Sequence, residues 1–281
     1  MKSTLRSLAA AALAALLAGL TPQASRADQA LAVTLLGNQL ITVDTTTGDQ
    51  ALVGMLGPVG PFGLASYNQQ VFTFDSAAHA LRRLDPATGA TLATVDVGIG
   101  PVAGQGGLAI GGNGVGYLTT ALDPTSLAPA NDLYRFDLTA GTSTLVAHTA
   151  VALQAIAFAP NGTLFGVGKL DDALYTVGAD GSTNLVGGTG VMNGSLTGGL
   201  TFAPNGTLYA TINDTLYTLN TTTGQATSVL SDPTTANAPF GGISGLAFVP
   251  EPSSVVLLGA GLVGLGLAAR RRRGGRRAVA G

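Results

Sequence analysis

Short runs in which apolar and polar residues alternate fill most of the middle of the chain. The clearest run is at residues 200–203, where Leu and Phe alternate with Thr and Ala, and the alternation resumes at 208–212. Alternation with a period of two is typical of strands that have one face buried. A Pro-Asn-Gly sequence at 204–206 separates the two runs, and Asn-Gly accepts the positive φ angles that a tight hairpin needs. The pattern therefore predicts short antiparallel strands.

These runs belong to an internal repeat. Its first landmark is a strand that begins like Gly-Leu-Ala and recurs at spacings of 44, 48, 44 and 46 residues. Its second landmark is a strand that ends in a turn, usually rich in Thr and Gly. Four short antiparallel strands in about 45 residues match one blade of a β-propeller. The first landmark occupies residues 63–65, 107–109, 155–157, 199–201 and 245–247, and the second occupies 40–48, 81–89, 133–141, 174–181 and 216–224.

The two ends of the repeat region hold complementary parts of one unit. The first copy, residues 31–57, has the later strands but no Gly-Leu-Ala strand, and the last copy, residues 243–249, has that strand alone. Pairing the two would complete a blade and close a ring without an open sheet edge at the seam. We therefore predict an all-β fold, a single propeller of five four-stranded blades in which the C-terminal strand closes the first blade. The alternative is a linear β-solenoid, which would not explain the complementary ends.

Residues 1–27 have the features of a secretory signal peptide. Two basic residues precede an Ala- and Leu-rich stretch at 8–20, and small residues before Asp28 supply a cleavage site. The general secretory route is favoured, because no twin-Arg pair precedes the apolar stretch. A buried N-terminal helix is the alternative interpretation. We therefore assign residues 28–249 to the folded domain.

A second apolar segment lies near the C-terminus and precedes a basic cluster. Residues 253–269 are just long enough to cross ~30 Å of hydrocarbon as a helix. The basic cluster at 270–277 would stay in the cytoplasm, which places the folded domain outside. The alternative is a C-terminal helix of a soluble domain, but such a helix needs a polar face, and residues 255–268 have none. We therefore predict a transmembrane segment at 253–269.

Residues 250–281 resemble the PEP-CTERM sorting signal, whose three parts they contain in order. The sorting motif is Pro250, Glu251 and Pro252, the apolar segment follows, and Arg270, Arg271, Arg272 and Arg273 form the basic stop. One departure is that residues 274–281 extend past this stop. Such tails occur on exported proteins of Gram-negative bacteria that make exopolysaccharide, and a membrane protease-transpeptidase called exosortase is taken to remove them. The middle of the chain resembles the propeller-like domains often attached to such tails, without the Trp-Asp signature of WD40 blades.

The resemblance implies a route for the protein and a class of function. It implies an exported chain that is anchored for a time in the inner membrane by its C-terminal helix and then reaches the cell surface or the exterior. It implies exosortase as a partner and an association with exopolysaccharide or biofilm. We therefore predict a non-enzymatic surface or extracellular-matrix protein. The alternative is a secreted carbohydrate-active enzyme built on a five-bladed propeller.

The charge of the predicted domain differs from that of the whole chain. Residues 28–249 hold fourteen Asp and four cations, Arg82, Arg83, Arg135 and Lys169, and so have a net charge near −10. Such a domain is a poor partner for nucleic acid or for an anionic membrane surface. The chain has no Cys, so the exported domain must be held together by its core without disulfides.

Residues with catalytic or metal-binding chemistry are few in the predicted domain. His79 and His148 have no partner at metal-ligand spacing, and the absence of Cys further argues against zinc or thiol chemistry. Asp171-Asp172 is an adjacent carboxylate pair, but it lies where a hairpin turn belongs. We therefore predict no catalytic, cofactor or metal residue, although the oxygen-rich loops leave calcium binding open.

Aspartates also recur at one position of the repeat. Asp44, Asp85 and Asp137 each end a strand before a turn, and Asn220 takes the same position once. A catalytic residue would be expected once, not once per blade. We therefore predict that these side chains hydrogen-bond the backbone of their own turns.

Three long connections, residues 121–132, 187–197 and 231–241, are candidates for recognition. Long loops on a rigid scaffold commonly carry binding residues, and the alternative is that they only join blades. A structure distinguishes the two functional hypotheses. Two carboxylates that face each other across the central channel, within ~10 Å, would favour the enzyme. A channel lined by Gly, Ala and Leu would argue against it.

Overall fold

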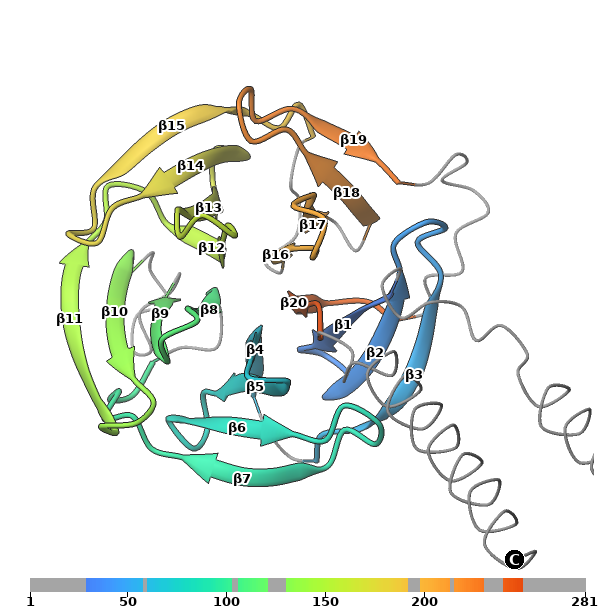
Figure 1. Ribbon diagram of the computed structural model, residues 1–281, viewed down its shortest axis with the longest axis vertical. Coiled ribbons are helices and arrows are strands. Elements are labelled where there is room, and N and C mark those ends of the chain that lie inside the picture. The colour runs from blue at the N-terminus through green and yellow to red at the C-terminus, as the bar shows by residue number, and fades with distance from the viewer. Residues whose placement is uncertain are drawn as a thin grey trace, which may run out of the picture. The chain divides into compact units, whose positions relative to one another are not determined.

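The computed structural model describes seven stretches of the chain, and every regular element in them is a β-strand. Twenty strands form five antiparallel sheets of four strands each. The sheets are arranged as blades around a common axis, with one strand of each blade near the axis and one at the rim (Figure 1). The predicted five-bladed propeller is therefore confirmed. The described stretches are 29–57, 60–102, 106–120, 130–191, 198–212, 215–229 and 240–249.

Within each blade the strands follow one another outward from the axis. Blade 1 consists of β20 (Ile243–Ala247), β1 (Gln29–Thr34), β2 (Gln39–Asp44) and β3 (Gln50–Met55). Blade 2 consists of β4 (Pro61–Tyr67), β5 (Gln70–Asp75), β6 (Ala80–Leu84) and β7 (Thr91–Val95). Blade 3 consists of β8 (Leu108–Ile110), β9 (Val115–Thr120), β10 (Asp132–Asp137) and β11 (Thr142–His148). Blade 4 consists of β12 (Leu153–Phe158), β13 (Leu164–Gly168), β14 (Ala173–Val177) and β15 (Thr183–Gly188). Blade 5 consists of β16 (Gly198–Phe202), β17 (Leu208–Ile212), β18 (Thr215–Leu219) and β19 (Ala226–Ser228).

Blade 1 joins the two ends of the domain. Its innermost strand β20 pairs antiparallel with β1, with Leu31 opposite Ala247 and Val33 opposite Gly245. Without β20, β1 would present a free edge toward the axis, so this pairing closes the ring. The predicted sharing of one blade between the C-terminal strand and the N-terminal strands is confirmed.

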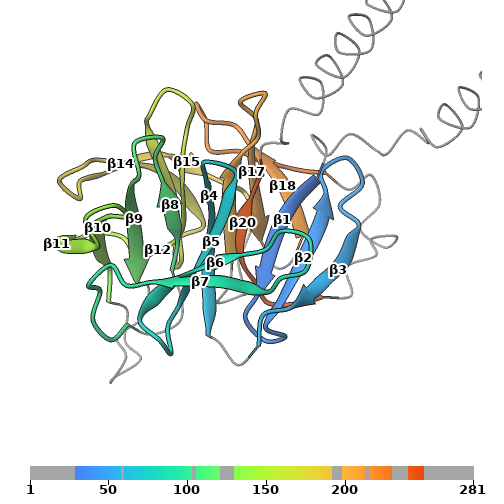
Figure 2. The same cartoon turned by 60° about the horizontal axis from the view of Figure 1, so that its bottom comes forward.

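The ring has two distinct ends. The last residues of the five inner strands surround one mouth of the central axis, and we call this side the tail end, because the chain leaves β20 there. We call the opposite side the loop end, since the connections between successive blades start there. Figure 2 shows the blades obliquely, with their strands running between the two ends.

Glycine at the start of the inner strands lets neighbouring blades approach each other at the axis. A Cβ at Gly107 would lie 2.4 Å from the backbone nitrogen of Ile156 in the next blade, and one at Gly245 would lie 2.4 Å from that of Leu64. Atoms in a close-packed interior do not come this near, so packing explains why Gly begins most copies of the repeat. The same constraint holds at Gly63 and Gly199.

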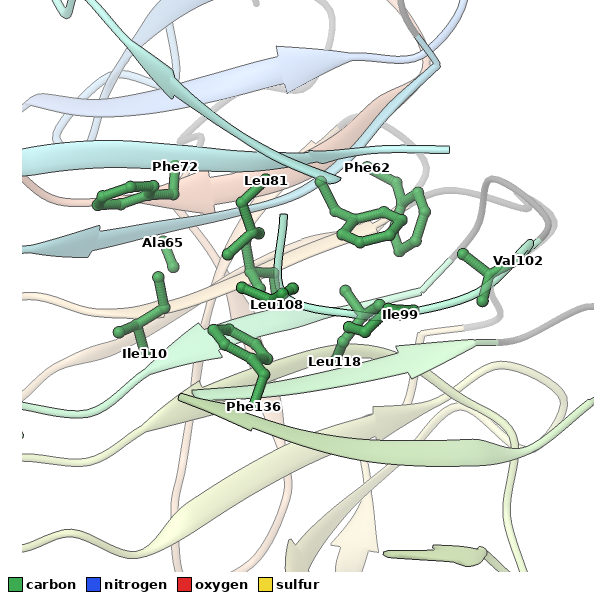
Figure 3. Close-up of a cluster of buried hydrophobic side chains, with 12 residues drawn as sticks. Phe62, Ala65, Phe72, Leu81, Ile99, Val102, Leu108, Ile110, Leu118 and Phe136 are labelled. Carbon is green, nitrogen blue, oxygen red and sulfur yellow. The ribbon is translucent and has the colours of Figure 1, made fainter. Parts of the chain in front are cut away.

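Apolar clusters fill the spaces between neighbouring blades. Between blades 2 and 3, Phe62 and Phe136 are almost fully buried, and the rings of Phe62 and Phe74 lie 5.2 Å apart. Figure 3 shows side chains from both blades meeting in this cluster, among them Leu108 and Leu118 of blade 3. Burial of each such side chain contributes about 1.5–3 kcal/mol, so these clusters hold the blades together.

Candidate functional site

The predicted export and sorting signals lie outside the described residues. This applies to residues 1–27, to the motif Pro250-Glu251-Pro252, to the segment 253–269 and to the basic stop Arg270–Arg273. In the described part of the chain, no helix is long and apolar enough to cross a membrane.

The described chain ends in packed residues immediately before the predicted sorting motif. Phe248 is 5% exposed, and its ring lies 5.7 Å from that of Tyr209 in blade 5. Val249 packs on the apolar cluster between blades 1 and 2 and is the last residue of the compact unit that holds the propeller. No spacer in the sequence therefore separates the packed ring from Pro250.

The central axis of the ring is narrow and mostly apolar. The space along it has no volume for a water molecule. None of the described residues that line it carries a carboxylate, so the pair of facing carboxylates that would favour the enzyme is not present among them. The lining consists of Gly63, Leu64, Gly107, Leu108, Ala155, Ile156, Gly198, Gly199, Leu200, Ser244, Gly245 and Leu246.

The recurring aspartates hold turns at the tail end, as the sequence predicts. The carboxylate of Asp44 accepts hydrogen bonds from the backbone N–H groups two and three residues later, at 2.8 and 3.0 Å. Asp137 and Asn220 make the same pair of bonds, and Asp85 makes one. The backbone hydrogen bonds hold the pKa of Asp137 below its usual value. These repeated side chains therefore have a structural role in the turns.

The two histidines lie in different blades, and neither belongs to a cluster of metal-binding side chains among the described residues. His79 is in the turn before β6. His148 is the last residue of β11, where it lies opposite Asp132 of β10. Its Nδ1 lies 2.6 Å from the Asp132 carboxylate on the exposed edge of blade 3. Across the described residues, no three His, Cys, Asp or Glu side chains come close enough together to hold a metal ion.

The adjacent carboxylates Asp171 and Asp172 lie in the hairpin between β13 and β14, as predicted. Asp171 accepts a hydrogen bond from the Tyr175 hydroxyl. Burial and this carboxylate raise the pKa of Tyr175 to about 12. The two carboxylates therefore belong to a turn at the loop end, away from the lining of the axis.

The three candidate recognition loops are mostly outside the described residues, at 121–129, 192–197 and 231–239. Their predicted boundaries were too wide. Asp132 belongs to β10, since it pairs with Thr120. Likewise, Gly188 belongs to β15, since it pairs with Ala173 of β14.

An ion pair between Asp75 and Arg82 fastens the loop end of blade 2. The Arg82 Nε lies 2.6 Å from the Asp75 carboxylate, whose side chain is 1% exposed. Asp75 also accepts hydrogen bonds from the backbone N–H groups of Gly60 and Ala77, at 3.2 and 2.9 Å. Burial raises the pKa of Asp75, but Arg82 and the two N–H groups outweigh it, so the pKa lies below its usual value. Through Gly60, Asp75 also attaches the connection between blades 1 and 2 to the β5–β6 hairpin.

A cleft of about 560 Å³ opens at the tail end between blades 3 and 4. Its lining includes the β8–β9 turn at 111–113, the β12–β13 turn at 159–163, and the side chains of Tyr117, Arg135 and Phe158. The rings of Tyr117 and Phe158 lie 5.9 Å apart, edge to face, and Phe158 is half-buried. Ligand sites commonly have volumes of about 300–1,000 Å³ and aromatic walls with a few polar groups. This cleft is therefore the candidate binding site.

The aromatic pair in the cleft belongs to a pattern that repeats between blades. Phe165 and Phe202 form the corresponding pair between blades 4 and 5, at 5.6 Å, as Tyr209 and Phe248 do between blades 5 and 1. The pair by itself is therefore a packing feature of the ring. What distinguishes the cleft must come from other residues around the pair.

Arg135 is one residue that departs from the repeat. It lies opposite Tyr117 in the β9–β10 ladder. The corresponding positions are Thr42 in blade 1, Arg83 in blade 2, Thr176 in blade 4 and Thr218 in blade 5. Arg135 is exposed at the cleft, whereas Arg83 is half-buried.

Gly111 is the second residue at which blade 3 differs from blade 2, whereas blades 4 and 5 have the small residues Ala159 and Ala203 at this position. The residue at the same position of blade 2 is Tyr67, which packs on the cluster between blades 2 and 3 and places its hydroxyl 3.2 Å from where a Cβ of Gly114 would lie. At Gly111 there is no side chain, and a Cβ there would lie 3.6 Å from the Phe158 ring. The space that Tyr67 fills on one side of blade 3 is thus left open on the other side.

The sequence contains a signal for Arg135 that is independent of catalytic or metal-binding residue types. Arg83 and Arg135 each stand two residues before the recurring turn aspartate, where the other blades have Thr. Comparison of the repeat copies at this position would have identified both arginines. The cleft could not be found in this way, because it depends on which side chains meet between two blades.

Comparisons with known proteins identify a motif at one end of the chain and a fold in its middle. No curated protein matches the chain. A chain in the crystal structure of a nidogen/laminin complex is 14% identical, with a TM-score of 0.50, and the match covers 69% of this chain and 74% of that one. A Bacteroides thetaiotaomicron protein of unknown function is 13% identical, with a TM-score of 0.50, covering 69% of this chain and 52% of that one. At these identities the likenesses show the fold alone.

The C-terminal residues match a protein family directly. Residues 248–273 match the family described as the PEP-CTERM protein-sorting motif. The match begins at Phe248, which is packed in the ring, and continues through the predicted motif and basic stop. The resemblance seen in the sequence is confirmed: the chain carries a PEP-CTERM sorting motif at 248–273, which implies an exported protein that exosortase handles.

Proposed function

We propose that this protein is a non-enzymatic component of the cell surface or extracellular matrix, whose propeller binds exopolysaccharide. The observation that carries the proposal is the sorting motif at residues 248–273. The motif directs the chain to processing at the membrane and to a surface or extracellular fate. The signal peptide at 1–27 and the membrane anchor at 253–269 belong to the same proposal.

Two features of the described ring support a binding role over catalysis. The axis, where the enzyme hypothesis requires facing carboxylates, is lined by residues such as Gly107, Leu108 and Ile156 and leaves no space for water. The recurring aspartates are engaged in their own turns. A rigid, closed ring with an open cleft at its tail end suits recognition of an extended polymer.

The position of the sorting motif supports a further part of the proposal. Because β20 is paired with β1 and Phe248 is packed on Tyr209, exosortase acting at Pro250–Pro252 would leave the closing strand in place. The processed protein would then keep a complete ring. It would also lose the basic cluster at 270–277 and become strongly acidic.

Processing in a host that has exosortase tests the sorting part. The full chain should be recovered at the surface or in the medium with its C-terminal segment removed. A full chain with Ala at all three positions 250–252 should instead stay in the inner membrane with the segment intact. Equal distribution and equal mass of the two proteins would contradict the proposal.

Incubation with the host's own extracellular polysaccharide tests the binding part. The purified full chain should co-sediment with the polymer and should release no new reducing ends. Release of reducing ends would support the carbohydrate-active enzyme in its place.

A further inference from the structure

We propose that the cleft between blades 3 and 4 binds a sugar residue that carries a carboxylate, such as a uronic acid. This inference deepens the proposed function and rests on it, because it identifies the part of the propeller that would recognise exopolysaccharide. The argument depends on the state of Arg135, on the walls of the cleft and on the open space beside Gly111.

Arg135 is the cation of the domain that is available to a ligand. Of the other three cations, Arg82 is paired with Asp75, Lys169 is 7% exposed and Arg83 is half-buried. Arg135 is exposed and forms no ion pair or side-chain hydrogen bond with another described residue. The nearby carboxylate of Asp137 attracts Arg135 electrostatically, but it accepts its hydrogen bonds from the backbone of its own turn. The N–H donors of the guanidinium therefore have no hydrogen-bond acceptor among the described residues and can donate to a ligand.

The chemistry of this guanidinium favours a carboxylate. Its planar fork of N–H donors matches the two oxygens of a carboxylate in a bidentate arrangement, which a lysine ammonium does not reproduce. The domain has a net charge near −10, so polyanions should not adsorb to it without a local site. A carboxylate ligand that does bind would thus be expected at Arg135.

The walls of the cleft suit a sugar ring. Phe158 is half-buried and presents part of its ring to the cleft beside Tyr117, which offers apolar surface for the C–H face of a pyranose. The Asn113 side-chain oxygen accepts a hydrogen bond from the backbone N–H of Val115, at 3.1 Å. Its amide N–H₂ therefore remains as a donor to sugar hydroxyls, and Thr163 lines the opposite side.

Gly111 keeps the cleft open and provides a way to close it. The equivalent Tyr67 covers the corresponding place between blades 2 and 3. Gly111 does not have a positive φ angle, so the backbone accepts a side chain. A Cβ at this position would have close contacts of 3.2 Å to the Asn113 side-chain oxygen and 3.3 Å to the Val115 carbonyl, which require small adjustments. Gly111→Tyr should therefore fill the cleft as Tyr67 does on the other side.

Calorimetric titration of the full chain, purified in mild detergent, tests the proposal. The probe is a short oligogalacturonate, and its methyl ester is the matched ligand, because esterification removes the charge and keeps the sugar. We expect the acid to bind at least about tenfold more tightly than the ester, as loss of a charged hydrogen-bonded pair implies. Arg135→Thr, which installs the residue found in three other blades, should weaken binding of the acid by a similar factor. Arg83→Thr is the matched control and should leave binding unchanged.

Several results would overturn the proposal. These are equal binding of acid and ester, unchanged binding by Arg135→Thr, an equal loss in Arg83→Thr, and no binding of the acid at millimolar concentration. Gly111→Tyr should abolish binding while the thermal unfolding temperature stays near that of the wild type. If the wild type and Arg135→Thr both co-sediment equally with the host's polysaccharide, the cleft proposal fails and the proposed function stands. If the wild type does not co-sediment at all, the proposed function fails as well.

Discussion

The two faces of blade 3 use the same repeat positions and differ at the tail end. Toward blade 2, Tyr67 covers the apolar cluster and Arg83 is half-buried. Toward blade 4, Gly111 stands where Tyr67 does, and Arg135 is exposed beside a cleft of about 560 Å³. The comparison separates two kinds of position. Residues that recur from blade to blade build the ring, and the site opens where Gly111 leaves space and Arg135 is exposed beside it.

The largest effect on stability should come from substituting a glycine that recurs at the axis. Gly107→Val would place side-chain atoms within 2.4 Å of the Ile156 backbone, where no flexible group can move aside. We expect a loss of about 3 kcal/mol in the free energy of unfolding, measured by urea denaturation. Ala155→Gly, at the same repeat position of blade 4, is the control and should cost about 1 kcal/mol or less. Equal losses in the two variants would contradict the packing argument.

The next effect concerns the strand that closes the ring. Phe248→Ala removes a ring that is 5% exposed and packs on Tyr209, so we expect a loss of about 3 kcal/mol. A chain that stops after Val249 keeps this contact and should unfold at the same urea concentration as the full chain. A truncation effect as large as that of Phe248→Ala would show that the tail takes part in closing the ring.

A smaller effect is expected at the loop end of blade 2. Asp75→Asn removes a charged hydrogen bond to Arg82 and should cost about 2 kcal/mol near pH 7. Because the folded-state pKa of Asp75 is below its usual value, its contribution is present above about pH 4 and is lost as the pH falls through the folded-state pKa. The difference between wild type and variant in urea midpoint should therefore shrink toward pH 3. A difference that stays constant with pH would contradict the ionic origin.

The smallest effect on stability should come from the departures that form the cleft. Arg135→Thr changes an exposed side chain that forms no ion pair or hydrogen bond with the described residues, so the free energy of unfolding should change by no more than about 0.5 kcal/mol. Thermal unfolding of Arg135→Thr and of Gly107→Val, measured side by side, would compare the two losses of stability directly. A large loss in Arg135→Thr would place this residue with the recurring, structural positions.

Much of the ring could be predicted from the sequence, because the repeat carries its own packing rules. Gly at the start of the inner strands, the Asn-Gly hairpins and the turn-holding Asp44 and Asp137 each satisfy a local geometric requirement. Each requirement recurs in several copies, which makes it visible without a structure. The complementary ends at 31–57 and 243–249 similarly predicted the closing pair of β20 and β1.

The contacts between blades could not be predicted in the same way. The pairing of Asp75 with Arg82, and the meeting of Tyr117 with Phe158, depend on which faces of the strands turn toward each other. Strand spacing does not give this, and a register shift such as that between Phe62 and Leu64 changes which residues of neighbouring strands lie opposite each other. The candidate site lies in such a contact, and for this reason the sequence pointed to loops instead.

Retention by the host's own extracellular polysaccharide tests the central claim most directly. The measurement compares full chains that carry Arg135→Thr or Arg83→Thr, two substitutions of the same chemistry at the same repeat position on opposite sides of blade 3. The account predicts that Arg83→Thr is retained like the wild type and that Arg135→Thr loses at least about tenfold in affinity. Equal retention of the two variants would contradict it.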